Sequence, residues 1–341
     1  MSIIFFDIDG TIMDVNGSIP PSAAEAVRQL RQAGHHCIIN TGRPRIAMEP
    51  QLLELAFDGL VCSCGQYIQL DGRVLRHVGF DRDTSRKILE AGRRCLVDLY
   101  FEEASHIWVD TPHHHLNREL ENAVKRLERG GVRVGRPDGD PDFHFDKVCV
   151  LVGPDSRREE FLAEMAPLCQ IIDRGGGMFE LPMRGYSKAS GCRAVAQALG
   201  ANLADCYAIG DSPNDLEMLA CVGHPLVMGD APAEVQAQAE YVTAPLREDG
   251  LYFDLARHAN QLAFRLRDGI TSLGYPFPVS SPSNQQFPVL PNETVAKLQE
   301  MGYEFETDHP VDANHTCIRL VTSWATPETA VEDFLRDLAG C

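Results

Sequence analysis

The feature that most constrains the fold is an alternation of short apolar runs and amphipathic segments in the first quarter of the chain. An apolar run covers Ile3 to Phe6, an amphipathic segment opens at Pro21 and stops at Gly34, and a second apolar run covers residues 37–39. Another helical stretch follows Pro44, and residues 60–62 form a third short strand. Pro at the start of a helix and Gly just past its end are ordinary boundary signals. The alternation predicts an α/β fold in which helices cover a parallel sheet.

The pattern changes in the middle of the chain and then returns. From about Asp81 to Leu181, charged helices alternate with strands and with a turn-rich cluster at residues 136–141, as in an inserted α/β domain. A helix at 188–199 and short strands after it restore the first pattern, and a Pro-rich third segment begins near His258. We therefore expect a core made of residues 1–80 and 182–257, an insert at 81–181 and a small α/β domain at 258–341.

Composition and charge exclude several classes of protein. The 341 residues are 44% hydrophobic and 23% charged, which is an ordinary globular balance. The net charge of −18 argues against a nucleic-acid binder, which needs a basic face. A small anionic substrate remains compatible, because a metal ion and a few cations can reverse the potential within one cleft. The first residues carry no basic leader, and no apolar run approaches the roughly 18 residues of a membrane helix, so we expect a cytoplasmic protein without membrane contact.

Cysteine and histidine patterns give no metal site. The eleven cysteines are scattered, and the closest pair, Cys62 and Cys64, lacks zinc-site spacing. We expect buried, reduced thiols that pack as small hydrophobic side chains. The run His113-His114-His115 is predicted to be a solvated loop, because adjacent histidines cannot easily face one ion.

The first candidate site motif is Asp7-Ile8-Asp9-Gly10-Thr11, directly after the first apolar run. Strand alternation places Asp7 and Asp9 on one side, so one carboxylate can attack phosphorus while the other transfers protons. A calcium-binding loop is the alternative. Such a loop needs a longer acid spacing before its Gly, flanking helices and a terminal Glu, where this chain has Ser18.

Two further motifs supply phosphate-binding groups. Asn40-Thr41-Gly42-Arg43-Pro44 follows the second strand, and its hydroxyl and backbone N–H groups could cradle a phosphate, although Thr-Gly is also a common turn. Arg43 could contact the substrate or be structural. Lys188 begins a helix, where it could neutralise a phosphoryl oxygen and restrain Asp7, or be a solvated surface lysine.

The fourth motif, Gly210-Asp211-Ser212-Pro213-Asn214-Asp215, follows a strand. Asp211 and Asp215 next to Asp7 would form an all-oxygen cluster of the kind that Mg²⁺ prefers. The alternative is a helix N-terminus capped by Asp211 or Ser212.

With these four motifs in this order and strand context, residues 1–257 resemble the haloacid dehalogenase superfamily, in its Cof-type branch. The resemblance implies a Rossmann-like core with an α/β cap at 81–181 and a phosphatase activity. In addition to the four motifs, Glu180-Leu181-Pro182 leading to Lys188 and Met228-Gly229-Asp230-Ala231 match the family.

The resemblance also implies residue roles. Asp7 would form an aspartyl-phosphate, and Asp9 would protonate the leaving oxygen and then activate water. Mg²⁺ would be held by the Asp7 carboxylate, the Asp9 carbonyl and Asp211, with Asp215 in support. Thr41, Gly42 and Lys188 would bind the phosphoryl group, and Asn214 would help hold phosphate or its loop. Phosphomutases share this arrangement but need a cap that rebinds a phosphorylated sugar.

The third segment resembles the small C-terminal domain of low-specificity threonine aldolases. The resemblance rests on residues 281–288 and 318–326, where Arg319 matches the arginine that binds the amino-acid carboxylate. The cofactor-binding lysine and large domain of those pyridoxal-phosphate enzymes are absent, so carbon–carbon cleavage lacks its electron sink. We expect a packing or dimerisation module, or the remnant of a gene fusion.

The leading hypothesis is therefore a Mg²⁺-dependent phosphatase that acts on a small phosphorylated metabolite, such as a sugar phosphate, a nucleotide-like phosphate or pyridoxal phosphate. The alternatives are a regulatory fusion, in which the C-terminal part forms a homodimer or binds a partner or an amino acid, and a residual pyridoxal-phosphate lyase.

Overall fold

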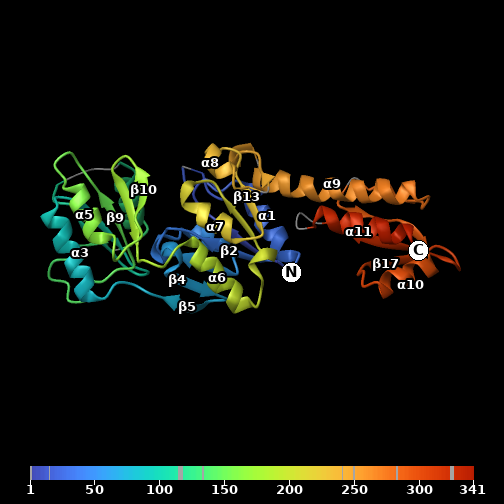
Figure 1. The fold of residues 1–341 in the computed structure, drawn as a ribbon, viewed down its shortest axis with the longest axis horizontal. Helices are drawn as coiled ribbons and strands as arrows, with labels where there is room; N and C mark the ends of the chain where they lie inside the picture. Colours follow the sequence, from blue (N-terminus) through green and yellow to red (C-terminus); the bar gives the residue numbers. More distant parts are fainter. Residues whose placement is uncertain are drawn as a thin grey trace. The chain divides into compact units, whose positions relative to one another are not determined.

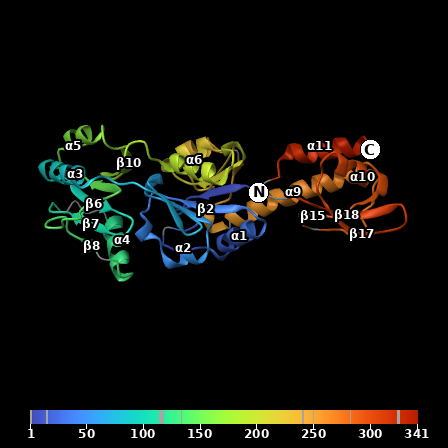
Figure 2. The same ribbon diagram turned by 90° about the horizontal axis from the view of Figure 1, so that it is seen from below.

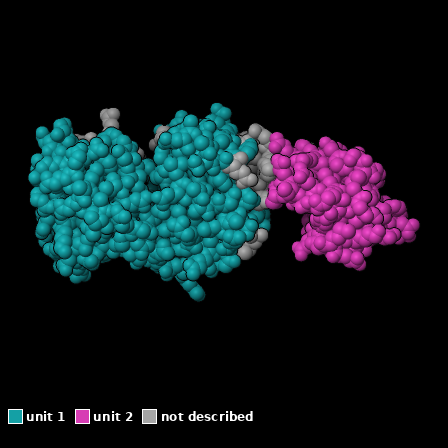
Figure 3. Space-filling view, viewed as in Figure 1, with its two compact units in different colours: residues 1–248 teal, residues 249–341 magenta. Residues whose placement is uncertain are grey.

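The computed structural model describes residues 2–14, 16–113, 118–132, 134–239, 241–248, 250–281, 283–322 and 326–341 (Figure 1). The chain divides into two compact units, residues 1–248 and residues 249–341 (Figure 3). None of the helices in the described ranges combines the length and apolar character that crossing a bilayer requires. Every cysteine is a free thiol, and all but Cys221 and Cys341 are buried, in keeping with the prediction.

An eight-stranded sheet forms the centre of the first unit, in the order β14-β13-β12-β1-β2-β3-β4-β5. Its strands are β1 (Ile3–Phe6), β2 (His36–Asn40), β3 (Gly59–Cys62), β4 (Tyr67–Leu70), β5 (Arg73–His77), β12 (Tyr207–Gly210), β13 (His224–Val227) and β14 (Tyr241–Val242). The strands from β14 to β3 run parallel, and β4 and β5 extend the sheet antiparallel. β1 is apolar and buried at all its positions, as expected for a parallel strand covered on both faces. The predicted α/β fold is confirmed.

In the described part of this core the α-helices are α1 (Pro21–Gln32), α2 (Pro50–Glu54), α6 (Lys188–Leu199), α7 (Leu216–Cys221) and α8 (Ala233–Gln236). The start of α6 is set by a capping box, in which the Ser187 and Ser190 side chains each accept a backbone N–H from the other residue. Its end is set by Gly200, whose φ of +68° is left-handed. The capping box therefore makes Lys188 the first helical residue.

The chain between β5 and α6 builds a second sheet of six strands, in the order β10-β11-β9-β6-β7-β8, and we call this part the cap. The strands are β6 (Asp98–Glu102), β7 (Ile107–Asp110), β8 (Val134–Gly135), β9 (Lys147–Leu151), β10 (Ile172–Gly175) and β11 (Met178–Pro182), and the helices are α3 (Arg82–Arg94), α4 (Arg118–Arg129) and α5 (Arg158–Met165). Phe101, Phe143 and Phe145 pack in an apolar cluster separate from that of the core. The cap therefore has its own hydrophobic centre.

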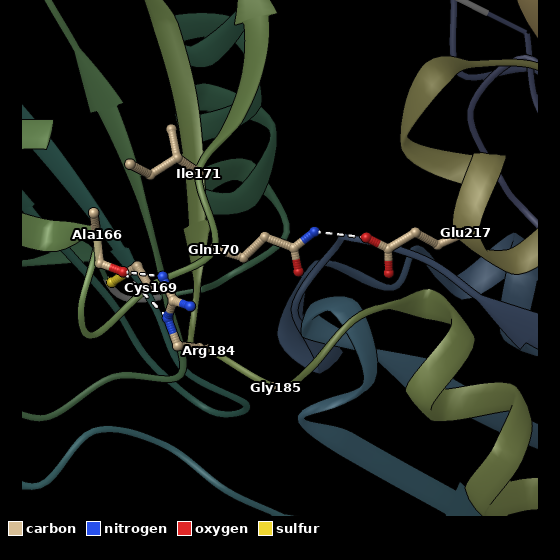
Figure 4. A pocket seen from close by; sticks show the side chains of 7 residues that line it. All are labelled: Ala166, Cys169, Gln170, Ile171, Arg184, Gly185 and Glu217. Atoms are coloured by element: carbon tan, nitrogen blue, oxygen red, sulfur yellow. Dashed lines mark hydrogen bonds between the residues drawn. The ribbon is translucent and has the colours of Figure 1, made fainter.

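Side-chain hydrogen bonds from Gln66 and Gln170 join cap and core. The buried Gln66 amide donates to the carbonyl oxygens of Val78 at 2.9 Å and Asp146 at 2.7 Å, while its oxygen accepts from the Met183 N–H at 2.9 Å. At a pocket of about 460 Å³, Gln170 of the cap donates to Glu217 of α7 at 2.8 Å (Figure 4). The chain passes from core to cap after β5 and returns after β11, and the Gln66 side chain is hydrogen-bonded to both connecting segments.

The second unit is a small α/β fold. Its helices are α9 (Gly250–Ser272), α10 (Asn292–Glu300) and α11 (Glu328–Ala339), and its strands are β15 (Gln285–Gln286), β16 (Val289–Pro291), β17 (Glu306–Pro310) and β18 (His315–Val321). β18 pairs antiparallel with each of the other three strands. Because α9 is one continuous helix, the boundary predicted between residues 257 and 258 falls inside it, and the first unit ends at Glu248.

Candidate active site

The four predicted motifs meet at one edge of the core sheet. Asp7 follows β1, Thr41 follows β2 and Asp211 follows β12, and these three parallel strands are neighbours in the sheet. The carboxyl ends of parallel strands share an edge, which is where open α/β sheets bind ligands. The capping box of α6 adds Lys188 to the same place.

Lys188 lies between two buried carboxylates. Its Nζ atom is 2.6 Å from Asp7 Oδ1 and 2.6 Å from Asp215 Oδ1, and the residues Asp7, Lys188 and Asp215 are 4%, 2% and 0% exposed. Burial alone would lower the pKa of Lys188, but the charges of Asp215 and Asp7 raise it above its ordinary value. Lys188 is therefore a fixed cation, and the alternative of a solvated surface lysine is wrong because solvent does not reach it.

The Asp215 carboxylate is held by backbone N–H groups of its own loop, residues 210–215. Its Oδ2 atom accepts N–H bonds from Asp211 and Ser212, both at 3.1 Å, while Oδ1 is taken by Lys188. Asp7, Asp211 and Asp215 each offer an oxygen within 4.8 Å of the others. This all-oxygen set fits Mg²⁺. Since the contacts of Asp215 already engage both of its oxygens, Asp7 and Asp211 are better placed to bind the ion directly.

Crowded acids shift the pKa values at this site. Burial and then the charge of Asp215 raise the pKa of Asp7 to about 8 and the pKa of Asp211 to about 7, from an ordinary value of 3.8. Without a bound metal ion, Asp7 and Asp211 of the folded protein keep their protons at pH values where the same groups of the unfolded chain have lost them. The free energy of unfolding of the cation-free protein therefore falls as the pH rises from about 4 to 8.

A bound cation replaces these protons, so its stabilising effect grows as the pH rises. We expect the increase in Tm on adding Mg²⁺ to be larger at about pH 8.5 than at about pH 6. Thermal melts of the wild type and Asp211→Asn would measure it, and the variant should show a smaller Mg²⁺ effect at both values. An increase that does not change with pH would contradict the cluster as the site of the ion.

Gly10 is required by the position of Asp211. Gly10 has a φ of +86°, and a Cβ atom there would lie 2.2 Å from Asp211 Oδ2. Thr11 Oγ1 donates to the other oxygen, Asp211 Oδ1, at 3.2 Å. A side chain at position 10 would therefore push the Asp211 carboxylate out of its position beside Gly10 and Thr11.

Gly10→Ala should abolish most of the activity and weaken Mg²⁺ binding. Gly17→Ala is the matched control, since Gly17 also has a positive φ, +79°, but a Cβ there meets nothing within 4 Å. Both variants carry backbone strain of roughly 1 kcal/mol, so the difference between their activities isolates the displacement of Asp211. Equal activities of Gly10→Ala and Gly17→Ala in a phosphatase assay would show that the reaction does not depend on the position of the Asp211 carboxylate.

The second motif forms a buried loop. Thr41 is 1% exposed, its Oγ1 accepts the Arg43 N–H at 3.2 Å, and its carbonyl accepts the Cys64 N–H. The Arg43 guanidinium donates to both carboxylate oxygens of Asp9 and lies 3.4 Å from Glu49. Arg43, whose role the sequence leaves open, thus holds the predicted acid–base residue.

The other predicted residues have local partners. The Asn214 side-chain oxygen accepts the Ser212 hydroxyl at 2.6 Å within its own loop. In the second unit, Arg319 pairs with Glu306, so its role in carboxylate binding stays a prediction. His114, His115 and residues 323–325 lie outside the described residues.

A charged cluster of the cap is missing from the sequence interpretation. Lys147 Nζ lies 3.0 Å from Glu102 and 3.2 Å from Glu180, and a Cβ on Gly42 would lie 3.3 Å from Glu180 Oε2. The one available signal was Glu180-Leu181-Pro182, which matches the family but gives no position relative to Gly42.

Comparisons with known proteins agree with this site. Residues 4–255 match the model of the haloacid dehalogenase-like hydrolase family. The putative phosphatase YkrA of Bacillus subtilis (strain 168) is 30% identical over 255 residues, which are 74% of this chain and 95% of YkrA. The HMP-PP phosphatase of Cronobacter sakazakii (strain ATCC BAA-894) is 26% identical over 249 residues, which are 70% of this chain and 87% of that protein.

Solved structures share this fold. A hypothetical protein from Geobacillus kaustophilus HTA426 is 30% identical, with a TM-score of 0.63 over 74% of this chain and 97% of that one. The sugar phosphatase BT4131, at 24% identity, shares the fold with a TM-score of 0.64 over 75% and 98% of the two chains. The chain therefore belongs to the haloacid dehalogenase-like hydrolase family, among its phosphoric monoester hydrolases.

Proposed function

We propose that the protein is a Mg²⁺-dependent phosphatase that hydrolyses phosphate monoesters of small metabolites through an aspartyl-phosphate on Asp7. The observation that carries this proposal is the buried arrangement in which Lys188 fixes Asp7 beside Asp211 and Asp215. A carboxylate held by a fixed cation next to an all-oxygen metal set is suited to attack on phosphorus.

The proposed reaction has two steps. A carboxylate oxygen of Asp7 forms a bond to phosphorus as the bond to the leaving oxygen breaks, and Asp9 gives that oxygen a proton. Asp9 then takes a proton from water, whose oxygen attacks phosphorus and breaks the bond to Asp7. Thr41, the Gly42 N–H and Lys188 bind the phosphoryl oxygens. The Asp7 carboxylate, the Asp9 carbonyl and Asp211 would hold Mg²⁺, whose charge would stabilise the phosphoryl group.

Arg43 positions the proposed acid–base residue. In the structure its guanidinium donates two hydrogen bonds to the Asp9 carboxylate. A phosphoryl group bound at Thr41 and Gly42 would offer the guanidinium a second anionic partner.

The test is a panel of phosphate esters assayed with Mg²⁺ and with a chelator. Relatives that carry the names HMP-PP phosphatase and 5-amino-6-(5-phospho-D-ribitylamino)uracil phosphatase suggest heterocyclic phosphates, and sugar phosphates and pyridoxal phosphate complete the panel. Phosphate release that disappears with the chelator and returns with Mg²⁺ is expected. No release from any ester, or release that the chelator leaves unchanged, would contradict the proposal.

For the second unit we propose a role in association, such as a homodimer. Its described surface exposes the apolar side chains of Val279, Met301, Val311 and Val321 by about half. Its one lysine in the sequence, Lys297, donates to the Cys341 carbonyl at 3.0 Å, which gives no support to pyridoxal-phosphate chemistry. Light scattering of the full chain should give a dimer mass, and a monomer at all concentrations would refute this role.

A further inference from the structure

The cap brings a compact set of charges to the rim of the catalytic cleft. Lys147 begins β9, Glu102 ends β6 and Glu180 lies on β11, and Lys147 is paired with Glu102 across the sheet. The buried Lys147 ammonium contacts both carboxylates. Burial would lower the pKa of Lys147, but the charges of Glu102 and Glu180 raise it, so it stays a cation.

This set lies directly against the phosphate-binding loop. A Cβ on Gly42 would lie 3.3 Å from Glu180 Oε2, 3.6 Å from Cys64 Sγ and 3.8 Å from Lys147 Nζ. Burial works to raise the pKa of Glu180, but the charges of Lys147, Arg174 and Lys188 lower it. The phosphate loop, the catalytic lysine and the cap charges therefore share one electrostatic environment.

Arg174 is the member of this set whose side chain remains partly exposed, at 33%. It lies on β10, which Figures 1 and 2 place on the side of the cap that faces the core. The register of β10 against β11 shifts between Asp173 and Gly175, at Arg174 itself. Such irregularities re-aim a side chain and are frequent next to active sites.

The guanidinium is left with free donors. Its contact in the described part of the chain is Glu180 Oε1, at 3.6 Å from Nε, which is too long for a hydrogen bond. Glu180 is already engaged through its other oxygen by Lys147. Burial would lower the pKa of Arg174, but the charges of Glu180 and then Asp7 raise it, so the guanidinium stays charged.

We propose that Arg174 is a subsite for a second anionic group, a carboxylate or a phosphate, on the part of the substrate that leaves. This inference rests on the proposed function and narrows its substrate class to phosphate esters that carry another acidic group. A planar guanidinium with free N–H donors is suited to binding carboxylate and phosphate oxygens in pairs. An ion pair with Lys147 holds Glu180, whose Oε1 atom lies 3.6 Å from Arg174 Nε.

Two matched substrate pairs test the subsite. 3-Phosphoglycerate is compared with glycerol 3-phosphate for the carboxylate, and fructose 1,6-bisphosphate with fructose 6-phosphate for the second phosphate. The ratio of kcat/KM within a pair does not depend on the amount of folded enzyme. In Arg174→Gln, the ratio for at least one pair should fall about tenfold or more, because a charge-assisted hydrogen bond to the substrate is lost.

In Arg174→Lys, the ratio of kcat/KM within a substrate pair should fall less than in Arg174→Gln. In Arg94→Gln, this ratio should stay at the wild-type value. Arg94 is a matched control, because it is an arginine of the cap on α3 that pairs with Glu164 at the surface. Unchanged ratios for both pairs in Arg174→Gln, in an enzyme that still hydrolyses phosphate esters, would overturn the subsite and leave the proposed function intact. No hydrolysis of any ester by the wild type would overturn both.

Discussion

Asp7→Asn is expected to lower kcat by at least about 10⁴-fold, since it removes the nucleophile and leaves no second route to the intermediate. The amide has nearly the shape of the carboxylate, so the packing around the 4%-exposed side chain should survive. The loss should therefore appear in kcat with little change in Tm. Steady-state phosphate release, with Tm from thermal melts, measures both.

Asp71→Asn is the control for this substitution. Asp71 has a positive φ of 45° in the turn between β4 and β5, where Asn is well tolerated. We expect it to keep the full rate. Substantial activity in Asp7→Asn would remove Asp7 from the reaction while leaving the protein an enzyme.

Lys188→Met should have two large effects, because one ammonium serves two buried carboxylates. We expect kcat to fall by about 10²- to 10³-fold through the loss of a fixed charge at the phosphoryl group. In the absence of Mg²⁺, the free energy of unfolding should fall by about 3–5 kcal/mol at about pH 8.5. At this pH few protons are available to neutralise the acids that have lost the lysine. Chemical denaturation measures the second effect.

Mg²⁺ should restore more stability to Lys188→Met than it adds to the wild type, because the ion then neutralises acids that lack their lysine. Lys87→Met, on the exposed face of α3, should match the wild type in both assays. A variant at position 188 with wild-type stability in the absence of Mg²⁺ would show that the ion pairs with Asp7 and Asp215 do not form.

The meeting of the candidate catalytic residues could be predicted from the sequence because their positions depend on local patterns. Asp7, Thr41 and Asp211 each follow a short apolar run, and parallel strands bring such positions to one edge without further information. The start of α6 also depends on a local pattern, because Ser187 and Ser190 form the capping box at its N-terminus. Together these signals fixed the core motifs and the α/β class.

The contacts that sequence reasoning missed depend on pairings distant along the chain. Nothing in the sequence near Lys147 indicates that Glu102 and Glu180 lie beside it, because the order of the cap strands decides that. The pairing of Arg43 with Asp9 likewise joins two separate strand ends. The hairpin of β4 and β5 was not predicted, although Asp71-Gly72 is a hairpin signal whose residues both have positive φ.

The most direct test of the account is to trap the intermediate. The protein is mixed with para-nitrophenyl phosphate and Mg²⁺, quenched during turnover and reduced with borohydride, which converts an aspartyl-phosphate to homoserine. Peptide mass spectrometry should find homoserine at position 7, and none in Asp7→Asn. An unmodified Asp7 in enzyme that is turning over, or a modified carboxylate at another position, would contradict Asp7 as the nucleophile.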